Sequence, residues 1–119
     1  MLTTFYIHKH KHKHRLMKKL KQFEREWLHE VDQLIYDNLD NANFTIQTLA
    51  FQLHLSTASF YRKMTKLTDS SPADYIRQKR LYEAKDLLQT EPNYSFKKLA
   101  NKVGYKREDY FAKIFEAAF

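Results

Sequence analysis

The chain has 119 residues, 43% of them hydrophobic, with one glycine, two prolines, no cysteine and a formal net charge of +7. This length fits one compact domain or two small lobes sharing a core, and so few helix breakers favour an all-helical fold. The lack of cysteine excludes disulfides, thiolate metal sites and thiol nucleophiles, and no apolar run approaches the roughly 20 residues of a membrane span.

The first element expected along the chain is a long amphipathic helix over residues 16–39. Its apolar residues recur at spacings of three and four, as on one face of a helix, and its second half is acidic on the outside. A heptad-like helix of this kind can also pair with a second copy of the chain. The apolar positions are Leu16, Leu20, Phe23, Trp27, Val31, Leu34, Ile35 and Leu39.

Two short helices separated by a tight turn come next. Thr45 can cap a helix over residues 46–53, and Ser56 can cap a second helix over residues 57–67. The turn requires a residue that tolerates positive φ, and His54 holds that place at the expense of some strain.

A longer helix over residues 72–89 begins at Ser71-Pro72-Ala73-Asp74, which supplies a cap, a proline at the first helical position and an acid in the first turn. Its expected buried residues are Tyr75, Ile76, Leu81, Ala84, Leu87 and Leu88.

The last part of the chain repeats the short-helix pattern. Ser95 caps a helix over residues 96–103, Gly104 supplies the positive φ of the turn, and a final helix runs from Arg107 to about residue 118. The cap of this final helix, Lys106, is a poor one.

Residues 43–64 and 93–114 are similar at a constant offset of fifty. Small residues in the first helix of each unit allow close approach of the second helix, which is basic in both units. This arrangement is typical of a helix-turn-helix, whose second helix enters the major groove of DNA. Helical hairpins that only pack are the alternative, although such solenoids usually need at least three units. The matched pairs include Asn43 with Asn93, Thr45 with Ser95, Leu49 with Leu99, Ala50 with Ala100, Phe60 with Tyr110, Tyr61 with Phe111, and Met64 with Ile114.

The charge is unevenly distributed. Residues 1–23 carry seven Lys or Arg and no acid, which accounts for the whole +7, whereas residues 24–40 carry one base and six acids. Residues 56–80 and 97–113 each carry six bases and two acids. Two basic regions therefore lie within or just after the two copies of the repeat, which favours a nucleic-acid partner.

The segments LSTASFYRKM, SPADYIRQKRLYEAKDLL and LANKVGYKREDYFAKIF resemble the DNA-binding domain of AraC/XylS-type bacterial transcription regulators, over about residues 26–119. The resemblance implies sequence-specific binding of double-stranded DNA and regulation of transcription, without enzymatic activity or a cofactor. It also implies RNA polymerase as a partner, a cytoplasmic location at the nucleoid, and a role as the output domain of a larger regulator.

The resemblance further implies a domain division. Residues 1–23 form a basic arm, residues 24–70 the first helix-turn-helix lobe, residues 72–89 a linker helix and residues 93–119 the second lobe. The family pattern has glycine at the place of His54 and often at that of Asp69. It also continues past Phe119 with a short final helix, so we expect the second lobe to lack its closing element.

Eight residues are expected to face the bases. In the first lobe Phe60, Met64 and Leu67 should lie in the core, which turns Thr57, Ala58, Tyr61 and Arg62 outward. In the second lobe Tyr110, Phe111, Ile114 and Phe115 should lie in the core, which turns Arg107, Glu108, Ala112 and Lys113 outward. Arg and Lys can contact guanine, small side chains can contact a thymine methyl, and Glu108 or Asp109 can accept from cytosine N4. The competing interpretations are packing for Tyr61 and helix-dipole complementation for the acids.

Seven further residues are candidates for phosphate contacts, which fix register without specifying sequence. They are Thr45, Ser56, Lys63, Lys66, Ser95, Lys97 and Lys106.

The arm contains HKHKHKHR, residues 8–15. Metal capture is disfavoured because no carboxylate orients the histidines and the lysines repel a cation; the alternatives are a phosphate-attracting arm or a segment foreign to the native chain. FYI followed by basic residues is similar to the cytoplasmic end of a membrane span, which suggests a membrane-tethered regulator. No catalytic spacing, glycine-rich phosphate loop or small-molecule site is evident, so an enzyme is excluded, and a helical protein-interaction module without DNA activity is the remaining alternative.

Overall fold

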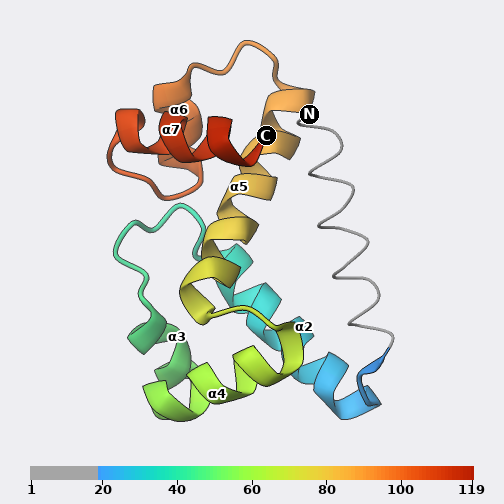
Figure 1. Cartoon of the computed structure of the whole chain (residues 1–119). Coiled ribbons are helices and arrows are strands. Elements are labelled where there is room, and N and C mark those ends of the chain that lie inside the picture. The colour runs from blue at the N-terminus through green and yellow to red at the C-terminus, as the bar shows by residue number, and fades with distance from the viewer. Residues whose placement is uncertain (1–18) are drawn as a thin grey trace.

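A computed structural model describes residues 19–119, and every regular element in that range is a helix. The elements are α2 (Gln22–Asp37), α3 (Ile46–Gln52), α4 (Thr57–Thr68), α5 (Pro72–Thr90), α6 (Phe96–Lys102) and α7 (Glu108–Ala118). Figure 1 shows α5 running through the middle of the molecule, with α2, α3 and α4 at one end and α6 and α7 at the other. The prediction of an all-helical fold with two lobes on a linker helix is confirmed.

The first lobe is built on one hydrophobic core contributed by α2, α3, α4 and the start of α5. Apolar side chains removed from water stabilise it by about 1.5–3 kcal/mol each. Tyr75 of α5 donates a hydrogen bond from its hydroxyl to Asp32 of α2, and Lys79 lies 3.3 Å from the same carboxylate, so α5 is also tied to α2 by polar contacts. The buried residues include Leu28, Val31, Ile35, Leu49, Ala50, Phe60, Met64, Leu67 and Tyr75.

The second lobe has its own core around the far end of α5. Phe111 lies at its centre and its ring centroid is 5.5 Å from that of Phe115 and 6.0 Å from that of Phe96. Such offset and edge-on aromatic pairs add to the stabilisation from burial. The buried residues are Leu81, Ala84, Leu99, Ala100, Val103, Phe111, Phe115 and Phe119.

Four helix starts agree with the caps predicted from sequence. The side-chain oxygens of Thr45, Ser56, Ser71 and Ser95 each accept a hydrogen bond, at 3.1 to 3.2 Å, from the backbone N–H three residues later. His54 adopts a positive φ of 60°, as expected for the turn of the first lobe. Positive φ also occurs at Asp69, the C-cap of α4.

The prediction of one continuous helix over residues 16–39 is wrong in the described part, because α2 begins only at Gln22. The backbone N–H of Lys21 donates to the carboxylate of Glu24 at 2.9 Å, and the guanidinium of Arg25 donates to the carbonyl of Leu20 at 2.5 Å. These bonds satisfy the backbone at a new helix start. The residues before Lys19 lie outside the described range.

The apolar face of α2 also differs from the prediction. Phe23 is 64% exposed, and Leu28, which the periodicity passed over, is fully buried. A helix that begins at Gln22 buries Leu28, Val31 and Ile35 at spacings of three and four, which leaves Phe23 in the first turn outside the core. The side of α2 that was expected to pair with a second chain is therefore occupied by the core of its own lobe.

The constant offset of fifty between the two units holds only as far as the turn. The backbone N–H of Leu55 donates to Ala50, and that of Tyr105 donates to Ala100, in agreement with this offset. However, α4 is capped by Ser56 whereas α7 is capped by Arg107, not Lys106, and this shifts the second helix to an offset of fifty-one.

The shift corrects the predicted core of α7. Phe111, rather than Tyr110, is the fully buried equivalent of Phe60, and Tyr110 is 42% exposed. Tyr61 is exposed as well, so the packing interpretation of Tyr61 is not supported. The extra residue lies between the turn and the cap, and Arg107 at the cap position makes no side-chain hydrogen bond to the helix backbone.

No helix within residues 19–119 is both long enough and apolar enough to cross a membrane.

Candidate nucleic-acid interface

The outer face of α4 carries the four residues predicted to contact bases in the first lobe. Thr57, Ala58, Tyr61 and Arg62 are all exposed, on the side opposite Phe60, Met64 and Leu67. The guanidinium of Arg62 donates to Ser59 Oγ at 3.2 Å, which holds it beside the first turn of the helix. A guanidinium has five N–H donors, so this contact is compatible with a bidentate contact to guanine.

The outer face of α7 carries the second set. Arg107, Glu108 and Lys113 are exposed, and Ala112 is half-buried. Arg107 is ion-paired with Asp109 at 2.8 Å; this contact raises the pKa of Arg107 and lowers the pKa of Asp109 below its ordinary value.

The shifted register changes which residues of the two lobes correspond. Glu108, Asp109, Ala112 and Lys113 occupy the places of Thr57, Ala58, Tyr61 and Arg62, respectively. Arg107 occupies the cap position, which Ser56 holds in the first lobe.

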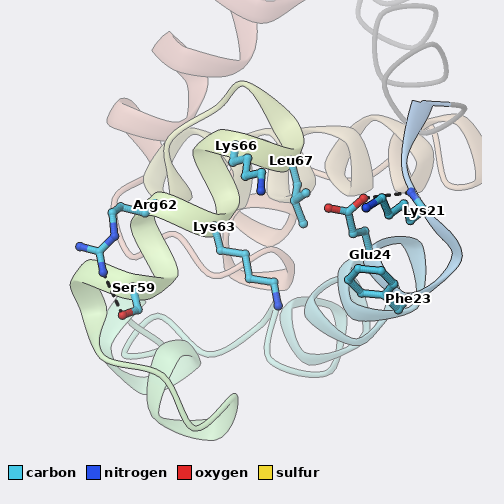
Figure 2. Close-up of a pocket in the computed structure, with 8 residues that line it drawn as sticks. All are labelled: Lys21, Phe23, Glu24, Ser59, Arg62, Lys63, Lys66 and Leu67. Atoms are coloured by element: carbon cyan, nitrogen blue, oxygen red, sulfur yellow. Dashed lines mark hydrogen bonds between the residues drawn. The ribbon is translucent and has the colours of Figure 1, made fainter.

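A basic groove of about 420 Å³ lies between α4 and the start of α2. Figure 2 shows Lys63, Lys66 and Leu67 pointing from α4 toward Phe23 and Glu24 of α2. The ammonium of Lys63 lies 4.1 Å from the centroid of the Trp27 ring, a cation–π contact that fixes this side chain. The groove is lined by Lys21, Phe23, Glu24, Ser59, Arg62, Lys63, Lys66 and Leu67.

With four basic side chains against one acid, the groove suits an anion such as a DNA phosphate. Lys21 had not been singled out from the sequence, where it is one of seven bases in the arm. Only the break before α2 brings Lys21 beside α4.

The remaining phosphate candidates are divided between the two lobes. Thr45 and Ser56 cap α3 and α4, whereas Ser95 caps α6 and Lys97 lies in its first turn; all four are exposed. Lys106 donates to the side chain of Asn43 at 3.1 Å, and so it contacts the loop of the first lobe.

The first basic region is smaller at the surface than its charge suggests. Arg77 is ion-paired with Asp74 at 2.7 Å, and Lys79 lies against Asp32. Arg80 is buried. The basic face of the first lobe is therefore contributed by α4 and Lys21 rather than by the linker helix.

The two outer helix faces lie at opposite ends of α5. In Figure 1, α4 and α7 both begin on the left of the view and run toward the right. Their exposed first turns are therefore presented on one side of the molecule.

No group of three or more His, Asp or Glu within the described residues could hold a metal ion. The histidine-lysine repeat of the arm lies outside the described range.

Comparison with known proteins identifies the family. The model of a protein family described as "Helix-turn-helix domain" matches residues 49–119. The chain belongs to the AraC-type helix-turn-helix domains, which are DNA-binding domains of transcription regulators. The resemblance noted from the sequence is thereby confirmed, and the class is one that binds DNA rather than one defined by catalysis.

Three curated proteins are similar over most of the chain. "HTH-type transcriptional regulator AlkR" of Acinetobacter baylyi is 33% identical over 64% of the chain, and the E. coli "Uncharacterized HTH-type transcriptional regulator YdiP" is 33% identical over 71%. "Histidine kinase P4" of Formosa agariphila is 25% identical over 84% of the chain. The chain spans 24%, 28% and 7% of the lengths of these three relatives, respectively.

Solved structures have the same fold. The C-terminal domain of the two-component response regulator yesN from Fusobacterium nucleatum is 26% identical, with a TM-score of 0.70, covering 77% of this chain and 96% of that one. The C-terminal domain of AraT, a response regulator from Geobacillus stearothermophilus, is 22% identical with a TM-score of 0.72, over 85% of this chain and 79% of that one.

Proposed function

We propose that this domain binds double-stranded DNA sequence-specifically, with α4 and α7 in two successive major grooves of one face of the duplex. The observation that carries the proposal is the presentation of both exposed helix starts on one side of the molecule, at the two ends of α5 (Figure 1). The 19 residues of α5 span about 28 Å at 1.5 Å per residue. This length is close to the 34 Å or so between successive major grooves.

Base contacts are assigned to the outward residues of both helices. In the first lobe, Arg62 contacts guanine, Thr57 and Ala58 contact a thymine methyl, and Tyr61 contacts a base edge or the sugar beside it. In the second lobe, Lys113 takes the place of Arg62. Glu108 accepts from cytosine N4 and Ala112 lies against a base.

In this proposal Arg107 makes a phosphate contact in place of the base contact expected from the sequence. It holds the cap position of Ser56, which faces the backbone at the mouth of a major groove, and its exposed guanidinium suits phosphate. Phosphate contacts are also assigned to the basic groove, through Lys21, Lys63 and Lys66. The other phosphate contacts are assigned to Thr45, Ser56, Ser95, Lys97 and Lys106.

The test is selection of binding sites from a random duplex library at about 150 mM salt, a concentration at which nonspecific binding is weak. The intact chain is compared with Arg62→Ala combined with Lys113→Ala. The matched control combines Arg77→Ala with Lys98→Ala, which removes the same charge from side chains that contact only their own lobe or helix. We expect a two-part motif, with parts about ten base pairs apart, from the intact chain and the control but not from the double variant.

A helical protein-interaction module without DNA activity is the alternative function. It predicts no enriched motif and binding that falls steeply with salt, as purely electrostatic contacts do. A motif that survives loss of both Arg62 and Lys113 would refute the assigned base contacts while leaving the DNA-binding function standing.

We further propose that the domain is the output part of a larger regulator. The support is the length of its relatives, of which the chain spans 7% to 28%, and the presence among them of a protein named as a histidine kinase. In this arrangement the domain acts at the nucleoid, and a sensor that precedes it, in the membrane or beside it, supplies the signal. Sequencing the native locus tests this: an open reading frame that adds no sensor or receiver domain contradicts it.

Two partners complete the proposal. A transcription regulator acts by recruiting or obstructing RNA polymerase, and a second copy of the chain is bound through the N-terminal helix, α2, on which Phe23 and Tyr36 are exposed. Sedimentation of the intact chain and of Phe23→Ala combined with Tyr36→Ala tests the second partner. A dimer that persists in the double variant would place the dimer interface elsewhere.

A further inference from the structure

Arg80, in the middle of α5, is the only charged residue buried among residues 19–119, at 7% exposed. No carboxylate is bonded to it. Its guanidinium instead donates to three backbone carbonyls: Leu39 at 3.0 Å, Val103 at 2.7 Å and Asn41 at 3.4 Å.

These acceptors come from both lobes. Leu39 and Asn41 belong to the loop that joins α2 to α3, and Val103 is the C-cap of α6, at the turn of the second helix-turn-helix. The Arg80 side chain therefore joins two loops that are more than sixty residues apart in the sequence and belong to different lobes.

The surroundings of Arg80 are shaped to hold it in place. Its guanidinium carbon lies 5.8 Å from the ring centroid of Tyr105, within the range of a cation–π contact. Gly104 leaves the space that the guanidinium occupies, because a Cβ at residue 104 would lie 1.6 Å from Arg80 Nη1 and 2.3 Å from the Leu39 carbonyl oxygen. The ammonium of Lys106 donates to the side-chain oxygen of Asn43, which joins the same two loops directly.

A buried guanidinium is tolerated only when its donors are satisfied, and moving it would leave both the charge and the carbonyls without partners. Burial lowers the pKa of Arg80 from its ordinary value, in keeping with this dry environment. The planar guanidinium offers several donors in a fixed fork, so it constrains the direction as well as the distance between the loops.

We propose that Arg80 is a positioning residue that locks the two helix-turn-helix lobes at one relative orientation, and that this lock determines the half-site spacing the domain accepts. Arg80 touches no base in this arrangement. It acts by holding α4 and α7 in a fixed relation. The effect on half-site spacing rests on the proposed function, whereas the lock on the relative orientation of the lobes does not.

The physical consequence for DNA is a narrow tolerance for spacing. One inserted base pair moves the second half-site by about 3.4 Å along the axis and rotates it by about 34° around the duplex. A locked pair of lobes cannot follow both displacements. Without the lock, the lobes are joined by the packing of α5 against the two cores and by its three-residue connection to α4, and such a pair can adjust.

The first experiment needs no DNA. Residual dipolar couplings are measured for backbone amides of the intact chain, of Arg80→Met and of Arg77→Met, with thermal unfolding to check that each is folded. Arg77 is the matched control, because it removes the same charge from the same helix but pairs only with Asp74. We expect the couplings of both lobes to fit one alignment tensor in the intact chain and the control, and two different tensors in Arg80→Met.

The second experiment measures affinity for duplexes whose two half-sites are separated by the selected spacing or by one base pair more or less. The intact chain and Arg77→Met should prefer the selected spacing by about tenfold or more, the effect of a mismatched base pair. In Arg80→Met this preference should fall below about threefold, with unchanged affinity for an isolated half-site. If Arg80→Met does not fold, Arg80→Lys, which keeps the charge but loses the fork, should give an intermediate preference.

One alignment tensor in folded Arg80→Met or Arg80→Lys would overturn the lock. Two tensors with an undiminished spacing preference would overturn its role in spacing. A failure of the intact chain to select any two-part motif would refute the proposed function, and the couplings would still decide whether Arg80 locks the lobes.

Discussion

Replacement of Gly104 by alanine tests how the two lobes are joined. His54 and Gly104 are equivalent turn residues with positive φ, 60° and 89°, and backbone conformation alone predicts a cost of only about 1 kcal/mol for Gly104→Ala. The structure distinguishes them, because a Cβ at residue 104 would overlap Arg80 and the Leu39 carbonyl, whereas the side chain of His54 is exposed.

The expected loss of stability in Gly104→Ala can be worked out from these contacts. Positive φ costs an alanine about 1 kcal/mol relative to glycine. The guanidinium of Arg80 is the end of a flexible side chain and can move, but moving breaks its bonds to Leu39 and Val103. Hydrogen bonds to a charged group contribute about 1.5 kcal/mol or more each, and the Leu39 carbonyl, a backbone group, must also shift, so the total loss is at least about 4 kcal/mol.

The assay is urea unfolding followed by circular dichroism, with His54→Ala as the matched control, for which we expect a change within about 0.5 kcal/mol. In an Arg80→Met background Gly104→Ala should be less costly by about 3 kcal/mol, because the two hydrogen bonds are already lost. The positive φ and the overlap with the Leu39 carbonyl remain. A cost below about 1.5 kcal/mol for Gly104→Ala in the otherwise intact chain, or full additivity with Arg80→Met, would refute the reasoning.

Three further outcomes can be checked with single variants. Phe111→Ala should cost about 3–5 kcal/mol in the same unfolding assay and Tyr110→Ala less than about 1 kcal/mol; the reverse order would contradict the shifted register of α7. Lys66→Ala should weaken binding equally for all DNA sequences and lower the slope of log affinity against log salt by about 1, and a changed base preference would show that Lys66 is not a phosphate contact. Burial and the Asp32 carboxylate raise the pKa of Tyr75 above its ordinary value of 10.0, so the unfolded chain releases this proton first. Stability of the intact chain should therefore fall above about pH 10, by up to about 1.4 kcal/mol per pH unit relative to Tyr75→Phe, and parallel pH profiles of the two proteins would exclude the effect.

The outward-facing residues of α4 follow from local spacing, and those of α7 do not. On α4, Phe60, Met64 and Leu67 define a buried side that the sequence pattern locates correctly, so Arg62 on the other side follows. On α7 the aromatic residues Tyr110 and Phe111 are adjacent, and either one satisfies the periodicity. Only the position of the cap at Arg107, determined by how the turn packs, decides that Phe111 is inside.

The starts of the helices could be predicted because the interactions that produce them are local. A serine or threonine oxygen accepts from a backbone N–H three residues away, so Thr45, Ser56, Ser71 and Ser95 act as caps wherever the helices later pack. The positive φ of His54 and Gly104 is similarly a property of the tight turn. The sequence by itself therefore determined the helices, the two units and the face presented by α4.

Contacts between segments distant in the sequence decided the rest. The sequence pattern does not distinguish Arg80 from the other basic residues of the linker helix. In the fold, Arg80 is buried and donates hydrogen bonds to backbone carbonyls of two loops. Leu28 rather than Phe23 lies in the core because α2 packs with Leu28, Val31 and Ile35 toward the rest of the first lobe. Lys21, just before α2, lines the groove beside α4. A sequence pattern records the preferences of neighbouring residues, whereas the burial of a charge depends on whether distant backbone groups can satisfy it, and this is known only when the chain is folded.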